Sequence, residues 1–227
     1  ANAIKFQSWD TTLFSKRVYE ENFFLGDDYR ERDDYTLYEI VDKFAITYDQ
    51  LEEMRGYCDE VEIDFATTPF SVTELDQLIE LRAPYIKIAS MDLTNPRLLT
   101  RAGQSDLPIL LSTGFGTLDE IEQAVRAIEA AGSRNIILLH CIGLYPPQDD
   151  EVNLNNMDML RTTFGYPVGF SDHTTGTEIA VAAIAKGAVV LEKHFTLDKE
   201  MFGWDHHMSA DPFELEGICR AADRLHK

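Results

Sequence analysis

Short apolar runs alternate with helical segments along most of this chain, and this alternation limits the fold more than any other feature. Seven runs predict buried strands, at residues 3–6, 63–66, 85–88, 109–111, 136–139, 168–170 and 189–191. Ahead of helical patterns lie residue pairs with capping-box spacing or close to it, namely Thr47 with Gln50, Ser71 with Glu74, Thr117 with Glu120 and Asp211 with Glu214. No β-hairpin signal interrupts the pattern, so the sequence predicts a parallel α/β architecture.

The number of strands bears on whether the sheet closes into a barrel. Eight strand–helix units close a barrel of about 250 residues, whereas this chain of 227 residues shows seven strands. Because the first apolar run begins at residue 3 without any lead-in, we expect a (β/α)8 TIM barrel whose first β/α unit lies upstream of Ala1. An open sheet is the alternative. We expect a single domain over residues 1–227.

Residues 10–47 depart from the regular alternation. The stretch is acidic and aromatic, and within it Leu37, Ile40, Val41 and Phe44 keep helical spacing. Long connections of this kind are usually lids or interface loops, and a plain surface insertion is the equal alternative. The sequence predicts a long inserted loop with one short helix.

The charge of the chain excludes some classes of partner. A net charge of −20 argues against nucleic acid and against an anionic membrane surface. The 3 cysteines have no CxxC spacing, which indicates a reducing compartment rather than a disulfide framework. No apolar run approaches the length of a membrane span, and the first residues lack a signal-peptide pattern. We therefore expect a cytoplasmic protein.

Two histidines follow two predicted strands at equivalent places. His173 comes after the strand at 168–170 and His194 after the strand at 189–191. The carboxyl ends of parallel strands are where such folds place their chemistry, and neighbouring strands lie about 5 Å apart, so both imidazoles could bind one divalent ion. A hydrogen-bonded scaffold role is the alternative for either histidine alone. Because each has a carboxylate beside it that could orient the ring, Asp172 or Glu192, a metal or catalytic site is favoured.

Two lysines stand in or at the end of predicted strands. Lys5 and Lys87 would be costly to bury unless each meets an anion. An ion pair with an acid of a neighbouring strand is one explanation. Several strand ends also carry hydroxyl groups, and lysines combined with hydroxyls are typical of a site for a phosphate and a carboxylate. The sequence thus predicts a small phosphorylated acid held beside a histidine-bound metal.

Seven segments, in order along nearly the whole chain, resemble those of the N-acylneuraminate (sialic acid) synthase family. They are residues 4–7 (IKFQ), 68–71 (TPFS), 86–90 (IKIAS), 111–114 (LSTG), 139–141 (LHC), 171–174 (SDHT) and 192–198 (EKHFTLD). The resemblance implies a transferase of carbohydrate biosynthesis that condenses phosphoenolpyruvate with an N-acylated aldose such as N-acetylmannosamine. The products would be a nonulosonic (sialic-type) acid and phosphate. It also implies a divalent metal, Mn²⁺ or else Mg²⁺ or Co²⁺, and a homodimer.

The resemblance assigns roles residue by residue. His173 and His194 would bind the metal. The residues that would hold phosphoenolpyruvate are Lys5, Thr68, Lys87, Ser90, Ser112 and Ser171. The residues that would contact the sugar are Tyr145, Asp205, Asp92 and Glu192. The catalytic set is His173, His194, Glu192 and Lys87, and Trp204 is a hypothesis for the acyl or sugar pocket.

The sequence departs from the family pattern at three points. The Glu-Ile-Gly-like motif of the family's first strand, whose glutamate takes part in proton transfer, does not occur here. We also expect this chain to lack the small C-terminal antifreeze-like domain of many family members. Gly143 stands where sialic acid synthases often have Asn or another polar residue, so the sugar is left open.

Two other functions are compatible with parts of the pattern. A metal-dependent aldolase or isomerase on the same barrel explains the histidines but not Lys5 and Lys87 together, and it would not need phosphoenolpyruvate. An inactive barrel fragment serving as an interaction module would lose no property on replacement of His173 and His194 by alanine.

Overall fold

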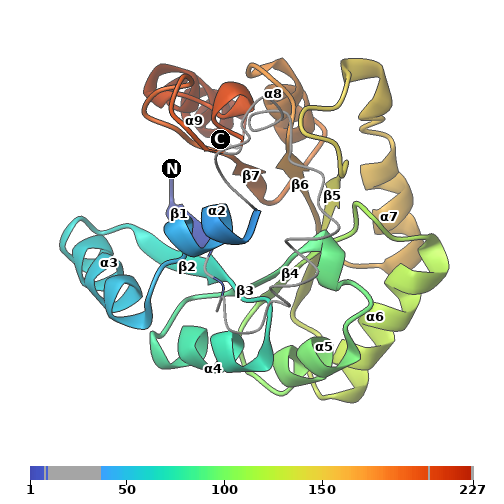
Figure 1. Ribbon diagram of the computed structural model, residues 1–227. Helices are drawn as coiled ribbons and strands as arrows, with labels where there is room; N and C mark the ends of the chain where they lie inside the picture. The colour runs from blue at the N-terminus through green and yellow to red at the C-terminus, as the bar shows by residue number, and fades with distance from the viewer. Residues whose placement is uncertain (8, 10–36, 204, 226–227) are drawn as a thin grey trace.

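The computed structural model describes residues 1–7, 9, 37–203 and 205–225. Parallel strands stand at the centre and helices surround them (Figure 1). The strands are β1 (Ala3–Gln7), β2 (Asp64–Thr68), β3 (Ile86–Ile88), β4 (Ile109–Ser112), β5 (Ile136–Cys141), β6 (Val168–Asp172) and β7 (Leu191–Lys193). All seven predicted strands are thus present. Two polar residues expected just after a strand lie within one instead: Ser112 is the last residue of β4, and Ser171 is the last but one of β6. The strand predicted at 189–191 is shifted, because β7 begins only at Leu191 and includes Glu192 and Lys193.

Each strand lies beside its neighbour in sequence. β1 pairs with β2, and β3 to β7 form a five-stranded sheet in sequence order, with every pairing parallel. β2 packs next to β3 without a shared ladder. Within the described residues no ladder joins β7 to β1, so the barrel is incomplete there. The predicted TIM-barrel class is confirmed.

The helices lie outside the strands. They are α2 (Leu37–Phe44), α3 (Tyr48–Glu60), α4 (Val72–Glu80), α5 (Pro96–Gly103), α6 (Leu118–Ala130), α7 (Asn156–Phe164), α8 (Glu178–Ala185) and α9 (Pro212–Leu225), with short 3-10 turns η3 (Ser90–Asp92), η4 (Asp149–Glu151) and η5 (His206–Met208). None of the described helices is long and apolar enough to cross a membrane.

Three of the four predicted capping boxes form completely. Thr47 with Gln50, Thr117 with Glu120, and Asp211 with Glu214 exchange side-chain hydrogen bonds with each other's backbone. In the fourth pair, Ser71 Oγ accepts from the N–H of Glu74, but the return hydrogen bond to the N–H of Ser71 is not made. Glu74 Oε2 accepts from the N–H of Phe70 instead, at 2.6 Å. These pairs satisfy N–H groups that the first helical turn leaves without partners.

Apolar side chains fill the space between the strands and the helices. The main cluster packs the helices α4, α5, α6 and α7 against the sheet. It includes Leu78, Ile86, Leu111 and Phe170, each no more than 1% exposed. A second cluster, with Phe65 at its centre, packs α3 on β1 and β2. Burial of apolar surface at this level supplies most of the favourable free energy of folding.

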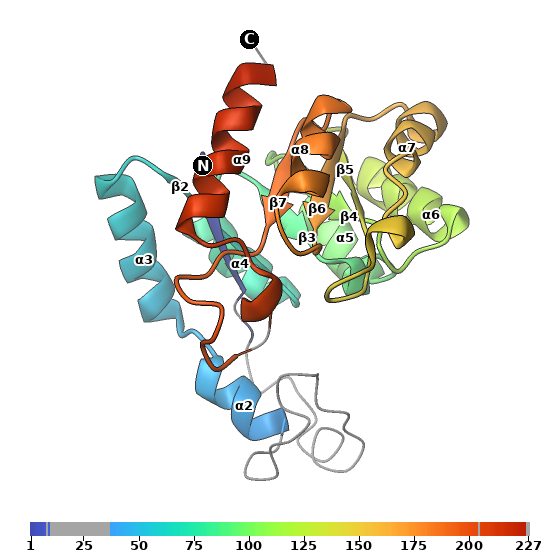
Figure 2. The same ribbon diagram turned by 90° about the horizontal axis from the view of Figure 1, so that it is seen from above.

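Helix α2 confirms the short helix predicted within the inserted stretch. It lies apart from the ring of helices, beside the loop after β7 (Figure 2), where the rings of Phe44 and Phe202 are 6.1 Å apart. Residues 10–36 lie outside the described residues, so the lid or interface role stays a prediction.

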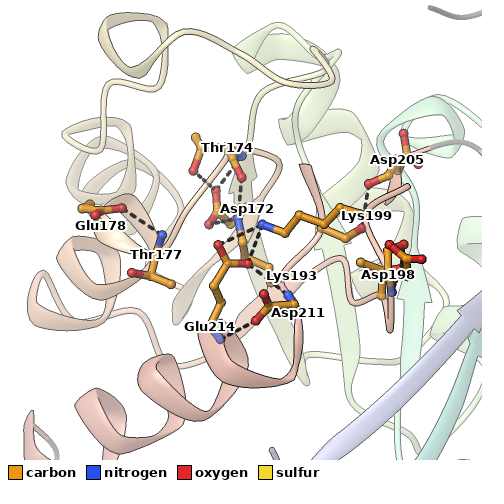
Figure 3. A network of polar contacts seen from close by, with 12 residues as sticks. Asp172, Thr174, Thr177, Glu178, Lys193, Asp198, Lys199, Asp205, Asp211 and Glu214 are labelled. Carbon is orange, nitrogen blue, oxygen red and sulfur yellow. Dashed lines mark hydrogen bonds and ion pairs between the residues drawn. The ribbon is translucent and has the colours of Figure 1, made fainter. Parts of the chain in front are cut away.

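A buried ion pair ties β6 to β7. Lys193 Nζ lies 2.8 Å from Asp172 Oδ2 and 2.5 Å from the carbonyl oxygen of Thr174, and Thr174 donates from both its N–H and its hydroxyl to Asp172 Oδ1 (Figure 3). The side chains are 4% and 0% exposed. The lysine charge and the carboxylate are therefore satisfied inside the protein.

We expect Lys193→Met to lower the free energy of unfolding by about 3–5 kcal/mol, because the variant leaves a buried carboxylate without its counter-charge. Urea denaturation followed by circular dichroism measures the loss. The double variant Asp172→Asn, Lys193→Met should lose less than the sum of the single variants. Arg126→Met, which breaks the exposed pair with Glu122, is the matched control and should change stability little. Wild-type stability of Lys193→Met would contradict the structural role.

Candidate active site

The carboxylate of Glu192 connects three strands at the carboxyl end of the barrel. Its Oε1 lies 3.3 Å from Lys5 Nζ, and its Oε2 lies 2.9 Å from Lys87 Nζ. Ser171 Oγ donates to the same Oε2 at 2.7 Å. β3 and β7 are opposite edges of the five-stranded sheet, so Lys87 and Glu192 meet only because the sheet curves around an interior. The site lies in that interior.

The structure answers how the two lysines are neutralised. Both share one acid, and Lys5 also donates to Thr68 Oγ1 at 2.9 Å. Burial by itself would raise the pKa of Glu192, but the charges of Lys87 and Lys5 and the Ser171 hydrogen bond outweigh it and hold that pKa well below its ordinary value. Burial lowers the pKa of Lys5 against the raising effect of Glu192. Two cations on one ionised carboxylate leave one positive charge for a further anion.

His173 and His194 lie together beside this cluster, with ring centroids 5.4 Å apart. Burial lowers the pKa of both, and for His194 burial and the neighbouring His173 bring it to about 3. Both imidazoles are therefore neutral near pH 7, as metal ligands must be. His173 Nδ1 lies 2.7 Å from the carbonyl oxygen of Ile142 and so donates to it, which leaves the lone pair on Nε2 available to a metal.

The residues present fit a metal that keeps open coordination positions. The described residues hold no group of three His, Cys, Asp or Glu side chains arranged around one ion. The two imidazoles would therefore be the protein's ligands, and water or substrate would complete the shell.

The expectation that Asp172 and Glu192 orient the imidazoles is wrong. Successive side chains of a strand point to opposite faces, so Asp172 is turned away from the interior and binds Lys193 and Thr174. Glu192 does face the interior, but its oxygens are occupied by the lysines and Ser171. His173 is oriented by a backbone carbonyl, and His194 Nδ1 lies 3.9 Å from Asp205 Oδ2.

Two of the predicted hydroxyl groups differ in their surroundings. Ser90 Oγ accepts from the N–H of Gly114 at 3.0 Å and lies 3.0 Å from Cys141 Sγ. Ser112 is 2% exposed, and its buried Oγ has no hydrogen-bond partner in the described part of the chain. A buried polar group without a partner is costly, so Ser112 is the hydroxyl that most needs a ligand.

The predicted sugar residues are only partly brought together. The ring of Tyr145 stacks on His173 at 4.2 Å between centroids and is 43% exposed, and Asp205 lies beside His194. Asp92 is buried in η3, where its Oδ1 accepts from Asn95, and burial raises its pKa. This hydrogen bond does not join Asp92 to the cluster around Glu192. Trp204 lies outside the described residues.

Sequence reasoning missed two features. The carbonyl of Ile142 is a backbone group, and nothing in the sequence marks it. The ring of Phe115 lies directly over Gly143, which is two residues before Tyr145. The only sign of this in the sequence was a glycine where the family often has a polar residue.

The chain is similar to known proteins over nearly its whole length. An uncharacterized protein of Methanocaldococcus jannaschii is 40% identical over 216 residues, covering 95% of this chain and 59% of that protein. An N,N'-diacetyllegionaminic acid synthase of Campylobacter jejuni is 36% identical over 234 residues, covering 100% of this chain and 68% of that protein. This chain thus spans about three fifths to two thirds of the length of these relatives.

A solved structure has the same fold. The N-acetylneuraminic acid (sialic acid) synthetase of Leptospira borgpetersenii serovar Hardjo-bovis superposes with a TM-score of 0.86 at 33% identity, over 99% of this chain and 73% of that chain. The profile of the NeuB family matches residues 1–227, the whole of this sequence. By its sequence and its barrel fold, this chain belongs to the NeuB family.

Proposed function

We propose that this chain carries the catalytic barrel of a synthase that condenses phosphoenolpyruvate with an N-acylated aldose to give a nonulosonic (sialic-type) acid and phosphate. The observation that carries the proposal is the sharing of one carboxylate by Lys5 and Lys87 beside two neutral imidazoles. The C. jejuni and L. borgpetersenii relatives are named for synthesis of acids of this type. The first aldose to test is N-acetylmannosamine.

Phosphoenolpyruvate carries a carboxylate and a phosphate, and this chain offers groups for both. Lys5 and Lys87 supply positive charge, and Thr68, Ser90, Ser112 and Ser171 supply hydroxyl groups. An incoming anion competes with Glu192 for the lysines. Glu192, once released, can contact the sugar.

His173 and His194 would hold the divalent metal, Mn²⁺ or else Mg²⁺ or Co²⁺. When bound, the ion supplies Lewis-acid polarisation of the acceptor aldehyde. C3 of phosphoenolpyruvate then forms a bond to the aldehyde carbon, water adds at C2, and phosphate leaves from C2. Lys87 and Lys5 stabilise the negative charge of the enol phosphate throughout. Tyr145, Asp205, Asp92 and Glu192 are the residues proposed to position the sugar.

Assembly, domain organisation and location belong to the same proposal. We propose a homodimer in the cytoplasm, with residues 1–227 as one barrel domain. The family membership supports these points.

A metal-dependent aldolase or isomerase is the alternative enzyme. It would use the histidines but would not need phosphoenolpyruvate. The excess positive charge around Glu192 favours the synthase, because an aldolase acting on a neutral sugar has no use for it.

Titration calorimetry with phosphoenolpyruvate, with and without Mn²⁺, tests the proposal. We expect binding to the wild type, a loss of at least about tenfold in affinity for Lys87→Met, and loss of the Mn²⁺ effect for the double variant His173→Ala, His194→Ala. Arg126→Met, far from the site on α6, is the matched charge control. No binding by the folded wild type would refute the synthase. Unchanged properties of the double variant would favour the inactive module.

Ser112→Ala should separate stability from binding. Because Ser112 Oγ has no partner among the described residues, its removal should leave the free energy of unfolding unchanged or slightly higher. Affinity for phosphoenolpyruvate should fall about 10-fold, the usual loss for one hydrogen bond to a charged group. Denaturation and calorimetry on the same sample measure both. An equal affinity would place Ser112 outside the anion site.

The neutrality of His194 predicts how stability depends on pH. Its pKa is about 3 in the folded chain, whereas an unfolded histidine has about 6.5, so the unfolded state binds more protons between these values. The metal-free chain should therefore lose stability as the pH falls below 6.5, by about 1–2 kcal/mol at pH 5 after allowance for the partial exposure of the ring. His194→Gln should reduce this slope in denaturation between pH 7 and 5. An identical slope would show that His194 titrates normally.

A further inference from the structure

The phenyl ring of Phe115, in the loop after β4, occupies the space that a side chain at Gly143, in the loop after β5, would take. Phe115 follows β4 and Gly143 follows β5. A Cβ atom built on Gly143 would lie 2.6 Å from Cζ and 2.7 Å from Cδ1 of Phe115, with Cε1 closer still. Gly143 is not among the glycines with positive φ, so its backbone accepts an ordinary side chain. The three atoms nearest to such a Cβ all belong to the phenyl ring, which therefore occupies the space that a side chain would take.

Both loops are anchored to residues of the candidate active site. Gly114, just before Phe115, donates its N–H to Ser90 Oγ at 3.0 Å. Ile142, just before Gly143, accepts from His173 Nδ1 at 2.7 Å. Tyr145, in the same loop, stacks on His173. The ring of Phe115 therefore lies over a loop, Ile142 to Tyr145, that contacts His173 twice, and it follows directly after a residue bonded to Ser90.

The exposure of Phe115 suggests a ligand rather than a core role. The residue is 62% exposed, although it stands beside polar groups that a substrate would desolvate. A phenyl ring offers no hydrogen bond to a phosphate or carboxylate, and the cationic groups for such an anion are Lys5 and Lys87. What meets the ring should be an apolar part of the other reactant. In an N-acylated aldose, whose carbons mostly carry hydroxyl groups, the acyl methyl group is the main apolar end.

We propose that Phe115 is a specificity-determining residue whose ring, packed over Gly143, contacts the acyl methyl group of the acceptor aldose. The inference rests on the proposed synthase function. The ring would form an apolar wall of the acceptor pocket, in the space that a side chain at position 143 would otherwise occupy. An acceptor that lacks the methyl group leaves the ring in water and gains less from binding.

Phosphate release with N-formyl-, N-acetyl- and N-propanoylmannosamine, at saturating phosphoenolpyruvate and Mn²⁺, tests the proposal. The wild type should prefer N-acetyl over N-formyl by about 10-fold in kcat/KM, the usual effect of one carbon in an apolar pocket. Phe115→Ala should bring this preference close to unity while KM for phosphoenolpyruvate stays the same. Phe115→Leu, which keeps an apolar side chain, should retain most of it. Phe213→Ala, an exposed phenylalanine on α9, is the control and should behave as wild type.

Three results of this assay would overturn the proposal. One is a Phe115→Ala variant that slows all three acceptors equally, which indicates a merely structural ring. Another is a change confined to phosphoenolpyruvate, which places the ring at the anion. The third is a wild type without acyl preference. Failure of the synthase function itself is seen separately, as absence of phosphoenolpyruvate binding in calorimetry, and it removes the basis of this inference as well.

A stability cycle checks the geometry without any turnover. Gly143→Ala should destabilise the wild type by a modest amount, because the new methyl group collides with the exposed ring, which must turn aside and lose its contact with the loop. The same change in a Phe115→Ala background should cost much less. Equal losses in both backgrounds would show that the ring does not lie over Gly143 in solution, and would also overturn the proposal.

Discussion

The ion pair between Lys87 and Glu192 is the contact on which the site depends. It joins β3 to β7, the two edges of the five-stranded sheet, across the interior of the barrel. Lys5 reaches the same carboxylate from β1, on the other side of the opening between β7 and β1. A flat sheet could not bring these three side chains together. The cluster is thus a product of curvature, and its excess positive charge is what makes the interior suitable for an anion.

Two neighbouring cross-strand pairs have different roles, one on each face of the sheet: one belongs to the site and the other stabilises the strands. Ser171 and Glu192 are register partners that face the interior, whereas Asp172 and Lys193, the next partners along, face the other way. The outward pair is buried, and both of its charged groups are hydrogen-bonded; it holds β6 and β7 together just before the two histidines. The inward pair remains close to the lysines and His173. One residue of shift in register would exchange these roles and destroy the site.

Much of this arrangement could be predicted from the sequence. The apolar runs predicted all seven strands, and Thr47 and Thr117 predicted the helix starts, because both signals act within a few residues of the chain. The position of His173 and His194 after strands in a parallel fold was enough to expect them side by side. The partners of Asp172 and Glu192 were not predictable in the same way. They depend on which face of the strand is turned inward and on which side chains of other strands lie opposite that face.

Local pattern by itself determined the fold class, the order of its elements and the residue types that gather at the carboxyl ends of the strands. The family could also be identified from the sequence, because seven short segments spread over nearly the whole chain resemble those of its members. Only the tertiary structure decided that two lysines share one acid, that a carbonyl orients His173, and that Ser112 has no partner among the described residues. Only the structure, too, placed Phe115 over Gly143. These contacts join residues from different strands and loops, and their distances follow from the curvature and packing of the barrel rather than from any spacing along the chain.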